Sequence, residues 1–307
     1  MMKRAIRFLL CVIIAFCLLP ADRAVLAADS PHPLAEPGGG GAVQPEKRAV
    51  SHLYVGGHDL AGGGYFAADG ASLEPGEDFT YHYDPASQTL TIQSAAITQP
   101  DGLGAQAAIY ADGDLTLALM GGSEISGEMI LTGIYVEGDL EIRSAGEGSL
   151  SISAQRGVCT LYDFSMTSGG LGIAGEGYGE GIFSEHGDAA VSGGEISITA
   201  NMYGICANEG DIVFSGGKTT IAGNTGLAAF AGGVDIIDGE IAIDAINDGI
   251  FCDCGDVTIR GGILDIKADN CVSAYGGGIT ISGGLARLTA GGWGLGASGP
   301  IAVSGGE

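Results

Sequence analysis

Acidic side chains recur along this sequence in pairs, and most of the pairs stand beside a glycine. The pairs are Asp112 with Asp114, Glu137 with Asp139, Glu185 with Asp188, Glu209 with Asp211, and Asp253 with Asp256. Carboxylate and backbone carbonyl oxygens form the ligand sets that calcium prefers. A second group of acidic and amide residues comprises Asn247, Asp248, Asp269 and Asn270. We therefore predict bound calcium, with these candidate ligands: Asp211, Asp248, Asp253, Asp256 and Asp269. The alternative is a solvated acidic edge, because Asp and Asn are ordinary turn residues.

Aromatic side chains recur at another fixed position, directly after a branched apolar residue. They are Tyr110, Tyr135, Phe183 and Phe251. Aromatic faces that are exposed along a groove can stack on sugar rings and bury apolar area. We predict that these four residues stack on carbohydrate. The alternative is that the rings pack on each other or under a loop.

The elements that position these residues follow from an internal repeat. A small residue followed by a branched apolar one recurs nine times, from Ala108-Ile109 to Gly294-Leu295, at intervals of 25, 24, 24, 23, 22, 23, 22 and 23 residues. Gly-Asp and Ser-Gly-Gly motifs recur in phase with it. A fixed period of this length is typical of solenoids, in which each unit buries its apolar face against its neighbours.

Each unit contains three short segments in which apolar residues alternate with others, which predicts three strands per unit. In the unit that begins at Gly204, the alternating pairs are Ile205 with Ala207, Ile212 with Phe214, and Thr219 with Ile221. We therefore predict an all-β fold, a right-handed parallel β-helix of about nine coils with three short strands per coil. The apolar residue after each small one should form a buried ladder.

The cysteines fit this repeat better than a metal or disulfide framework. Five remain after residue 27, an odd number without framework spacing. Cys252 falls in a column of small residues that we expect to point into the core, whereas Cys159 and Cys206 should face outward. The last two lie two coils apart, too far for a disulfide.

Composition along the chain predicts four regions. Residues 1–27 resemble a signal peptide, with Lys3, Arg4 and Arg7 before a short apolar run and a small-residue cleavage pattern. Residues 28–50 form a Pro/Gly-rich linker, 51–107 a small β leader or N-terminal cap, and 108–307 the β-helix repeats. The last repeat is incomplete, so we expect a C-terminally truncated helix that is part of a longer surface protein, or else a monomer. No second apolar run of membrane length follows, so no membrane span is predicted.

The charge of the chain limits its partners. The full sequence has a formal net charge of −25, and removal of residues 1–27 leaves −28, because four basic residues and one acidic residue are lost. Nucleic acid is not expected as a partner, since binding it requires basic patches that neutralise phosphates. A secreted or cell-surface location follows from the export signal.

Two repeat units, "GDIVFSGGKTTIAGNTG" and "GDVTIRGGILDIKADN", resemble the carbohydrate-binding β-helix family of cellulolytic clostridia, which has a pectate-lyase-like fold. The segment "LYVGG…YDPASQTLTI" resembles leaders of such repeats in surface proteins of Gram-positive bacteria. The resemblance implies non-catalytic binding of plant polysaccharides, including acidic ones, and of calcium among turn residues. The acidic column is broken at Gly233, Gly278 and Pro300, which argues against a continuous row of ions.

Three functions remain open at this point. The first is non-catalytic, calcium-assisted binding of extracellular polysaccharide, and the second is a structural adhesin or spacer without sugar specificity. The third is a polysaccharide lyase, whose base would be one of these scattered residues: Arg143, Arg156, Arg260, Lys267 and Arg287. None of them stands at a fixed spacing from an acidic cluster, so we assign no catalytic residue.

Overall fold

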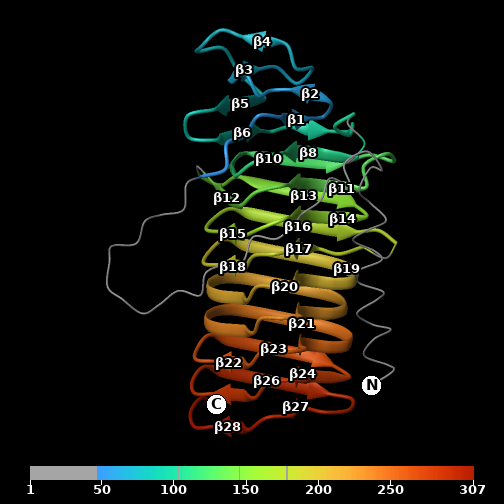
Figure 1. Cartoon of the computed structure of the whole chain (residues 1–307), viewed down its shortest axis with the longest axis vertical. Helices are drawn as coiled ribbons and strands as arrows, with labels where there is room; N and C mark the ends of the chain where they lie inside the picture. Colours follow the sequence, from blue (N-terminus) through green and yellow to red (C-terminus); the bar gives the residue numbers. More distant parts are fainter. Residues whose placement is uncertain (1–46, 103, 105, 145, 178) are drawn as a thin grey trace, which may run out of the picture.

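The computed structural model describes residues 47–307 except residues 103, 105, 145 and 178. The expected signal peptide and most of the expected linker lie outside the described residues. The described chain is all-β, and its parallel strands stack into a solenoid of about nine turns between residues 89 and 303 (Figure 1). The predicted fold class is confirmed. Within the described part of the chain, no helix is long and apolar enough to cross a membrane.

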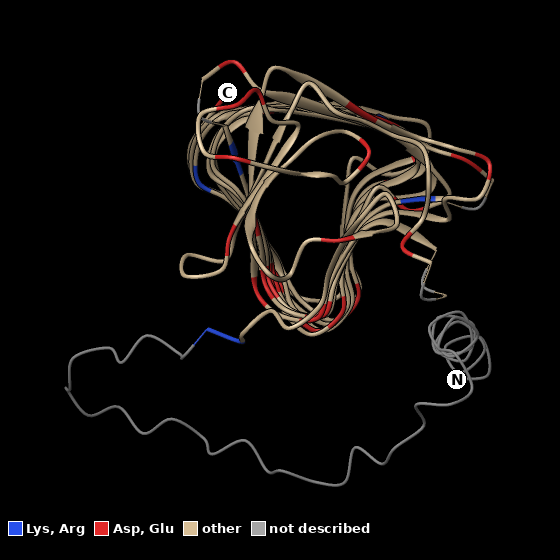
Figure 2. Ribbon diagram, turned by 90° about the horizontal axis from the view of Figure 1, so that it is seen from above, with Lys and Arg blue, Asp and Glu red and all other residues tan. Residues whose placement is uncertain are grey.

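Each turn of the solenoid contributes a strand to three sheets, and Figure 2 shows the resulting three-sided section. Face A is built from β8 (Ala107–Ala111), β11 (Thr132–Val136), β14 (Arg156–Thr160), β17 (Ile182–Ser184), β24 (Asn270–Ala274) and β27 (Leu295–Ala297). Three long strands, β19 (Glu195–Ala207), β20 (Ile212–Ala229) and β21 (Val234–Cys252), turn corners, and their last segments complete face A between β17 and β24.

Face B follows face A along the chain in every turn. Its strands are β6 (Thr89–Gln93), β9 (Leu115–Met120), β12 (Leu140–Ser144), β15 (Phe164–Met166), β18 (Ala189–Val191), the starts of β20 and β21, β22 (Val257–Ile259), β25 (Ile279–Ile281) and β28 (Ile301–Val303). Face C comes third. Its strands are β7 (Ala96–Ile97), β10 (Gly122–Ser126), β13 (Ser149–Ala154), β16 (Gly170–Gly175), the start of β19, the middles of β20 and β21, β23 (Ile263–Ala268) and β26 (Leu285–Ala290).

The core is the ladder of branched apolar residues that the repeat predicts. Ile182, Ile205, Leu227, Ile250 and Val272 pair in register on successive strands of face A, and all are fully buried. Burial of each such side chain contributes about 1.5–3 kcal/mol, and buried apolar columns of faces B and C complete the core.

A glycine precedes most rungs of this ladder for a steric reason. A Cβ added to Gly226 would lie 2.5 Å from both the carbonyl oxygen of Gly249 and Cγ2 of Ile243. The sequence repeats a small residue here because neighbouring turns approach too closely for a side chain. Between faces B and C, Gly194 and Gly217 have φ values of 82° and 79°, a conformation that glycine adopts without strain, which explains the Ser-Gly-Gly motif.

The N-terminal leader covers the first turn. It consists of β1 (Leu53–Val55), β2 (His58–Asp59), β3 (Gly64–Phe66), β4 (Ser72–Leu73) and β5 (Tyr81–Asp84). β1 pairs antiparallel with β8 on face A, and β5 pairs antiparallel with β6 on face B. The leader therefore satisfies the open strand edges at this end. The parallel stack itself already begins at β6, within the segment that the sequence assigns to the leader.

Candidate functional site

The corner between faces A and B carries a column of aspartates, which we name the Asp ladder. Its members are Asp114, Asp139, Asp163, Asp188, Asp211 and Asp256, and acidic residues gather at one corner in Figure 2. Oδ1 of Asp188 accepts a hydrogen bond of 2.8 Å from the backbone N–H of Asp211 in the next turn. Five further N–H groups bond in the same way to the aspartate one turn earlier, those of Asp139, Asp163, Asp188, Gly233 and Gly278. The carboxylates thus satisfy backbone donors at a corner where the sheet ladders are interrupted.

The glycine before each aspartate belongs to the same device. A Cβ on Gly210 would meet the carbonyl oxygen of Gly187 and would lie 2.6 Å from Oδ1 of Asp188. After Asp256, the next position of this column is Gly278, which has no carboxylate. None is needed there, because the following position is Pro300, which has no backbone N–H to bond. The Gly-Asp motif is therefore explained by the architecture of the corner.

The five predicted calcium ligands do not come together in one place. Asp211 and Asp256 are Asp ladder residues two turns apart, with Gly233 between them. Asp253 stands at the end of the β21 segment in face A, and Asp248 at its beginning, where it accepts a hydrogen bond from Ser273 Oγ at 2.9 Å. Asp269 lies before β24 on the following turn. Among the described residues, no group of three or more His, Cys, Asp or Glu side chains could hold a metal ion. The residues do not fit one oxygen cage, and calcium binding stays a prediction.

The interruption of the Asp ladder at Gly233 leaves a depression of about 380 Å³ on the adjoining part of face B. Asp211, Asp235, Asp256, Thr258 and Arg260 are among its lining residues. Nη1 of Arg260 lies 3.1 Å from Oδ2 of Asp235. Arg260, one of the five candidate bases of the lyase hypothesis, is therefore held in an ion pair in this structure.

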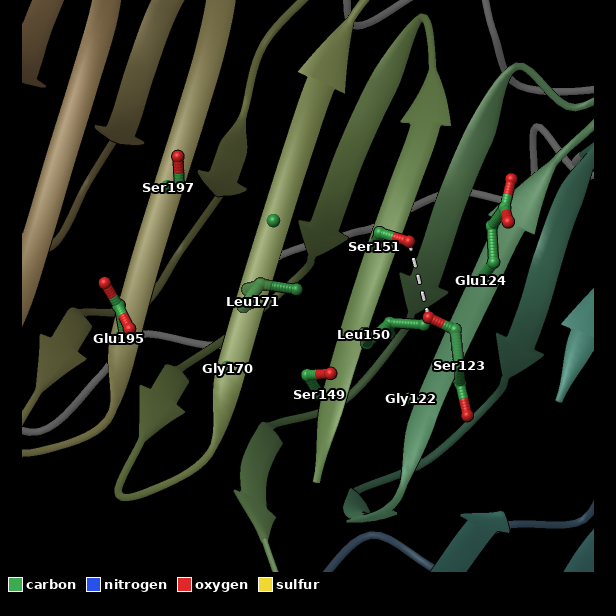
Figure 3. A pocket seen from close by; sticks show the side chains of 11 residues that line it. Gly122, Ser123, Glu124, Ser149, Leu150, Ser151, Gly170, Leu171, Glu195 and Ser197 are labelled. Carbon is green, nitrogen blue, oxygen red and sulfur yellow. Dashed lines mark hydrogen bonds between the residues drawn. The ribbon is translucent and has the colours of Figure 1, made fainter. Parts of the chain in front are cut away.

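A second depression, of about 410 Å³, lies on face C across β10, β13, β16 and the start of β19 (Figure 3). Its middle is the strand β16, where Gly170 and Gly172 have no side chains, and Ser149 and Ser151 stand on one side with Glu195 on the other. It is a shallow, open surface of small polar groups.

Aromatic residues of face A fall into two groups, and the first group is covered. Tyr110 is only 8% exposed, and its ring stacks on that of Tyr135 at 6.0 Å and 16°. The ring of Tyr54, from the leader, lies 6.5 Å from the Tyr110 ring. The hydroxyl of Tyr110 donates a hydrogen bond to Oε1 of Glu137 at 2.9 Å. The pKa of Tyr110 is raised, mainly because the side chain is buried and secondly because it bonds to the carboxylate of Glu137. Here the rings pack on each other.

The next turn of this column is also buried. Cys159 is buried between Tyr135 and the half-buried Phe183, its partners in register, and burial raises the pKa of its thiol to about 12. Nε of Arg156 lies 3.3 Å from Oε2 of the buried Glu180. Burial raises the pKa of Glu180, while Arg156 opposes that rise. Cys159 and Cys206 were expected to face outward, but both are buried because neighbouring side chains cover their column.

The second group, which we name the aromatic strip, consists of Tyr203, Phe230, Phe251 and Tyr275. Ring centroids of successive members are 5.7, 5.6 and 5.4 Å apart, and the rings are tilted or edge-on to one another rather than stacked. Tyr275 is 43% exposed, and the other three are half-buried. The four rings form a continuous apolar surface over four successive turns. Trp293, on the turn after Tyr275, is 67% exposed.

Sequence reasoning found only Phe251 of this strip. Phe230 and Tyr275 occupy another outward position, three residues after Leu227 and Val272 of the core ladder, where most other turns carry an acid or an amide. Comparing that column between turns could have found them. Comparison of the whole chain with protein families, curated proteins and solved structures finds no match. The fold and the site define a parallel β-solenoid with an aromatic strip on one face.

Proposed function

We propose that this chain is a non-catalytic, extracellular polysaccharide-binding protein and that the aromatic strip is its binding surface. One observation carries the proposal, namely a continuous run of four aromatic rings on successive turns, of which Tyr275 is exposed and the other three are half-buried. Apolar faces of sugar rings stack on such side chains, and a contiguous exposed patch of this kind marks an interaction surface. A repeating scaffold offers equivalent contacts to successive units of a polymer.

Two further features support the proposal. Tyr203 and Phe251 stand on strands, and Phe230 and Tyr275 directly follow the ends of β20 and β24, so the solenoid positions the rings and little conformational entropy is lost on binding. The sequence also predicts export, which would place the strip outside the cell together with extracellular polysaccharide.

The experiment measures retention of the purified protein on insoluble and immobilised glycans: cellulose, chitin, chitosan, starch and polygalacturonate. Phe230→Ala and Tyr275→Ala should each lower retention on the bound glycan by about tenfold, because stacking of a sugar ring on an aromatic side chain contributes on the order of 1 kcal/mol or more. Ile237→Ala is the control, since Ile237 is also exposed (41%) but lies at the corner between faces B and C. Equal retention of all three variants, with unchanged circular dichroism, would contradict the proposal.

The same assay addresses the two remaining hypotheses. Repeating it with a calcium chelator tests the calcium prediction, because retention that needs calcium should fall to the background. A protein that binds none of the glycans would favour the structural spacer.

A further inference from the structure

Resting on the proposed function, we propose that the aromatic strip selects saccharide units that carry a free ammonium group, and that it disfavours polyuronates. The ligand class is therefore an amino-sugar polymer rather than an acidic polysaccharide. Three features of the molecule support this preference: one carboxylate within the strip, the acidic surroundings of the strip, and a cation that the chain binds elsewhere between an aromatic ring and carboxylates.

The carboxylate is that of Asp253, which stands in one column with two rings of the strip. Its backbone N–H bonds to Ala229 at 2.9 Å, one residue before Phe230, and Tyr275 bonds to Cys252 at 2.8 Å, one residue before Asp253. Phe230, Asp253 and Tyr275 therefore project from successive turns, and the ring of Phe251 lies 5.6 and 5.4 Å from the two outer rings. Asp253 is half-exposed, and its carboxylate makes no hydrogen bond or ion pair with any described residue.

The surroundings of the strip are acidic. In the five turns that form this part of face A and its acidic corner, residues 203–211, 225–233, 248–256, 270–278 and 293–300, the sequence contains no Lys, Arg or His. The acidic residues in these ranges are Glu209, Asp211, Asp248, Asp253 and Asp256. A uronate polymer would bring like charge to this surface, whereas an ammonium group would meet both carboxylates and the negative faces of aromatic rings.

Elsewhere the chain itself shows that this combination holds a cation. Cζ of Arg48 lies 3.5 Å from the ring centroid of Tyr162, and its guanidinium pairs with Asp114 at 3.0 Å and Asp139 at 2.8 Å. Near the leader, the site formed by the ring of Tyr162 and the carboxylates of the corner is therefore occupied by a cation of the chain itself, the guanidinium of Arg48. At the aromatic strip the same chemistry is presented to solvent.

The test measures binding of four soluble 1,4-linked hexasaccharides by calorimetry: the β-linked hexamers of glucosamine, N-acetylglucosamine and glucose, and the α-linked hexamer of galacturonate. The glucosamine hexamer should bind about tenfold more tightly than the N-acetylglucosamine hexamer, from one exposed ion pair and cation–π contact. Its affinity should fall with added salt, and the galacturonate hexamer should bind most weakly.

A matched pair of variants separates a local effect from the net charge of the chain. Asp253→Asn should remove most of the preference for glucosamine and leave binding of the neutral hexamers unchanged. Asp238→Asn changes the net charge equally, but Asp238 lies between faces B and C, where its Oδ1 accepts the N–H of Gly239 at 2.8 Å. That variant should keep the preference.

The outcomes also distinguish this inference from the function on which it rests. Equal or weaker binding of glucosamine than of the neutral hexamers, or equal effects of the two Asn variants, would overturn the ammonium proposal while polysaccharide binding stands. Binding of no hexamer, together with wild-type behaviour of Tyr275→Ala, would overturn both.

Discussion

Two runs of aromatic side chains lie on the same face of this solenoid, and they differ in what surrounds them. Near the leader, Tyr110 is buried, its ring stacks on that of Tyr135, and the ring of Tyr54 lies tilted on its other side. Farther along, the rings of the aromatic strip come from three outward columns, and they are half-buried or, at Tyr275, exposed. Only Phe251 of the strip shares the column of Tyr110 and Tyr135. The first run packs within the fold, whereas the second is the one that we propose as a ligand surface.

The difference shows that a residue that points outward from a solenoid is not necessarily exposed to solvent. β1 brings Tyr54 beside Tyr110, and the buried pair of Arg156 and Glu180 lies on the turns that follow. In the turns that carry the strip, the described residues provide no comparable ion pair on face A. What covers each turn decides whether its aromatic residue is structural or accessible.

The largest expected effect sharpens this comparison directly. Tyr110→Ala should lower the free energy of unfolding by about 3–5 kcal/mol, because it leaves a cavity among buried residues. Phe251→Ala should cost only about 1–2 kcal/mol, since the ring is half-exposed. Urea titrations followed by circular dichroism measure both values, and similar losses for the two variants would mean that the two runs do not differ as described.

A second prediction breaks the ion pair next to the first run. Arg156→Met should destabilise the protein by about 3 kcal/mol at neutral pH, because it leaves Glu180 buried without its partner. The double variant Arg156→Met/Glu180→Gln should recover most of the loss. Persistence of the full loss in the double variant would show that packing of the arginine, rather than its charge, is responsible.

The pH dependence of the Arg156→Met variant follows from the raised pKa of Glu180. A carboxyl whose pKa is raised by folding favours the folded state below its unfolded pKa, and this contribution is lost as pH rises through the folded pKa. Removal of Arg156 raises that pKa further, because the arginine opposes the rise. The deficit relative to wild type should therefore shrink from neutral pH toward the ordinary range of glutamic acid, as thermal unfolding across pH would reveal.

The smallest effect is expected in the Asp ladder, which serves both runs alike. Asp188→Ala and Asp256→Ala should each cost about 1 kcal/mol, because a backbone N–H of the next turn loses its acceptor. Asp188→Asn and Asp256→Asn keep an oxygen in place and should be nearly neutral in thermal unfolding. A large loss in either Asn variant would show that the charge matters at this corner, and calcium titration of Asp256→Asn would then test for a bound cation.

The sequence by itself determined the solenoid, because its period fixes which residues stack. The core ladder through Ile205, Leu227 and Ile250 and the inward position of Cys252 follow from alternation alone, since neighbouring turns must bury the same face. The two corner motifs were visible as glycine patterns before their steric reasons were known.

Only the tertiary structure decided which outward residues are accessible and what the corner acids do. Exposure of Tyr275 and burial of Tyr110 depend on side chains from other turns and from the leader, which a repeat pattern in one column does not contain. The aspartates at the corner bond to backbone donors one turn away, an arrangement that exists only once the turns are stacked at their final spacing. The period of the repeat specifies whether a side chain points into the core or away from it. Whether an outward side chain is exposed, and which group it bonds to, depends on contacts between distant parts of the chain.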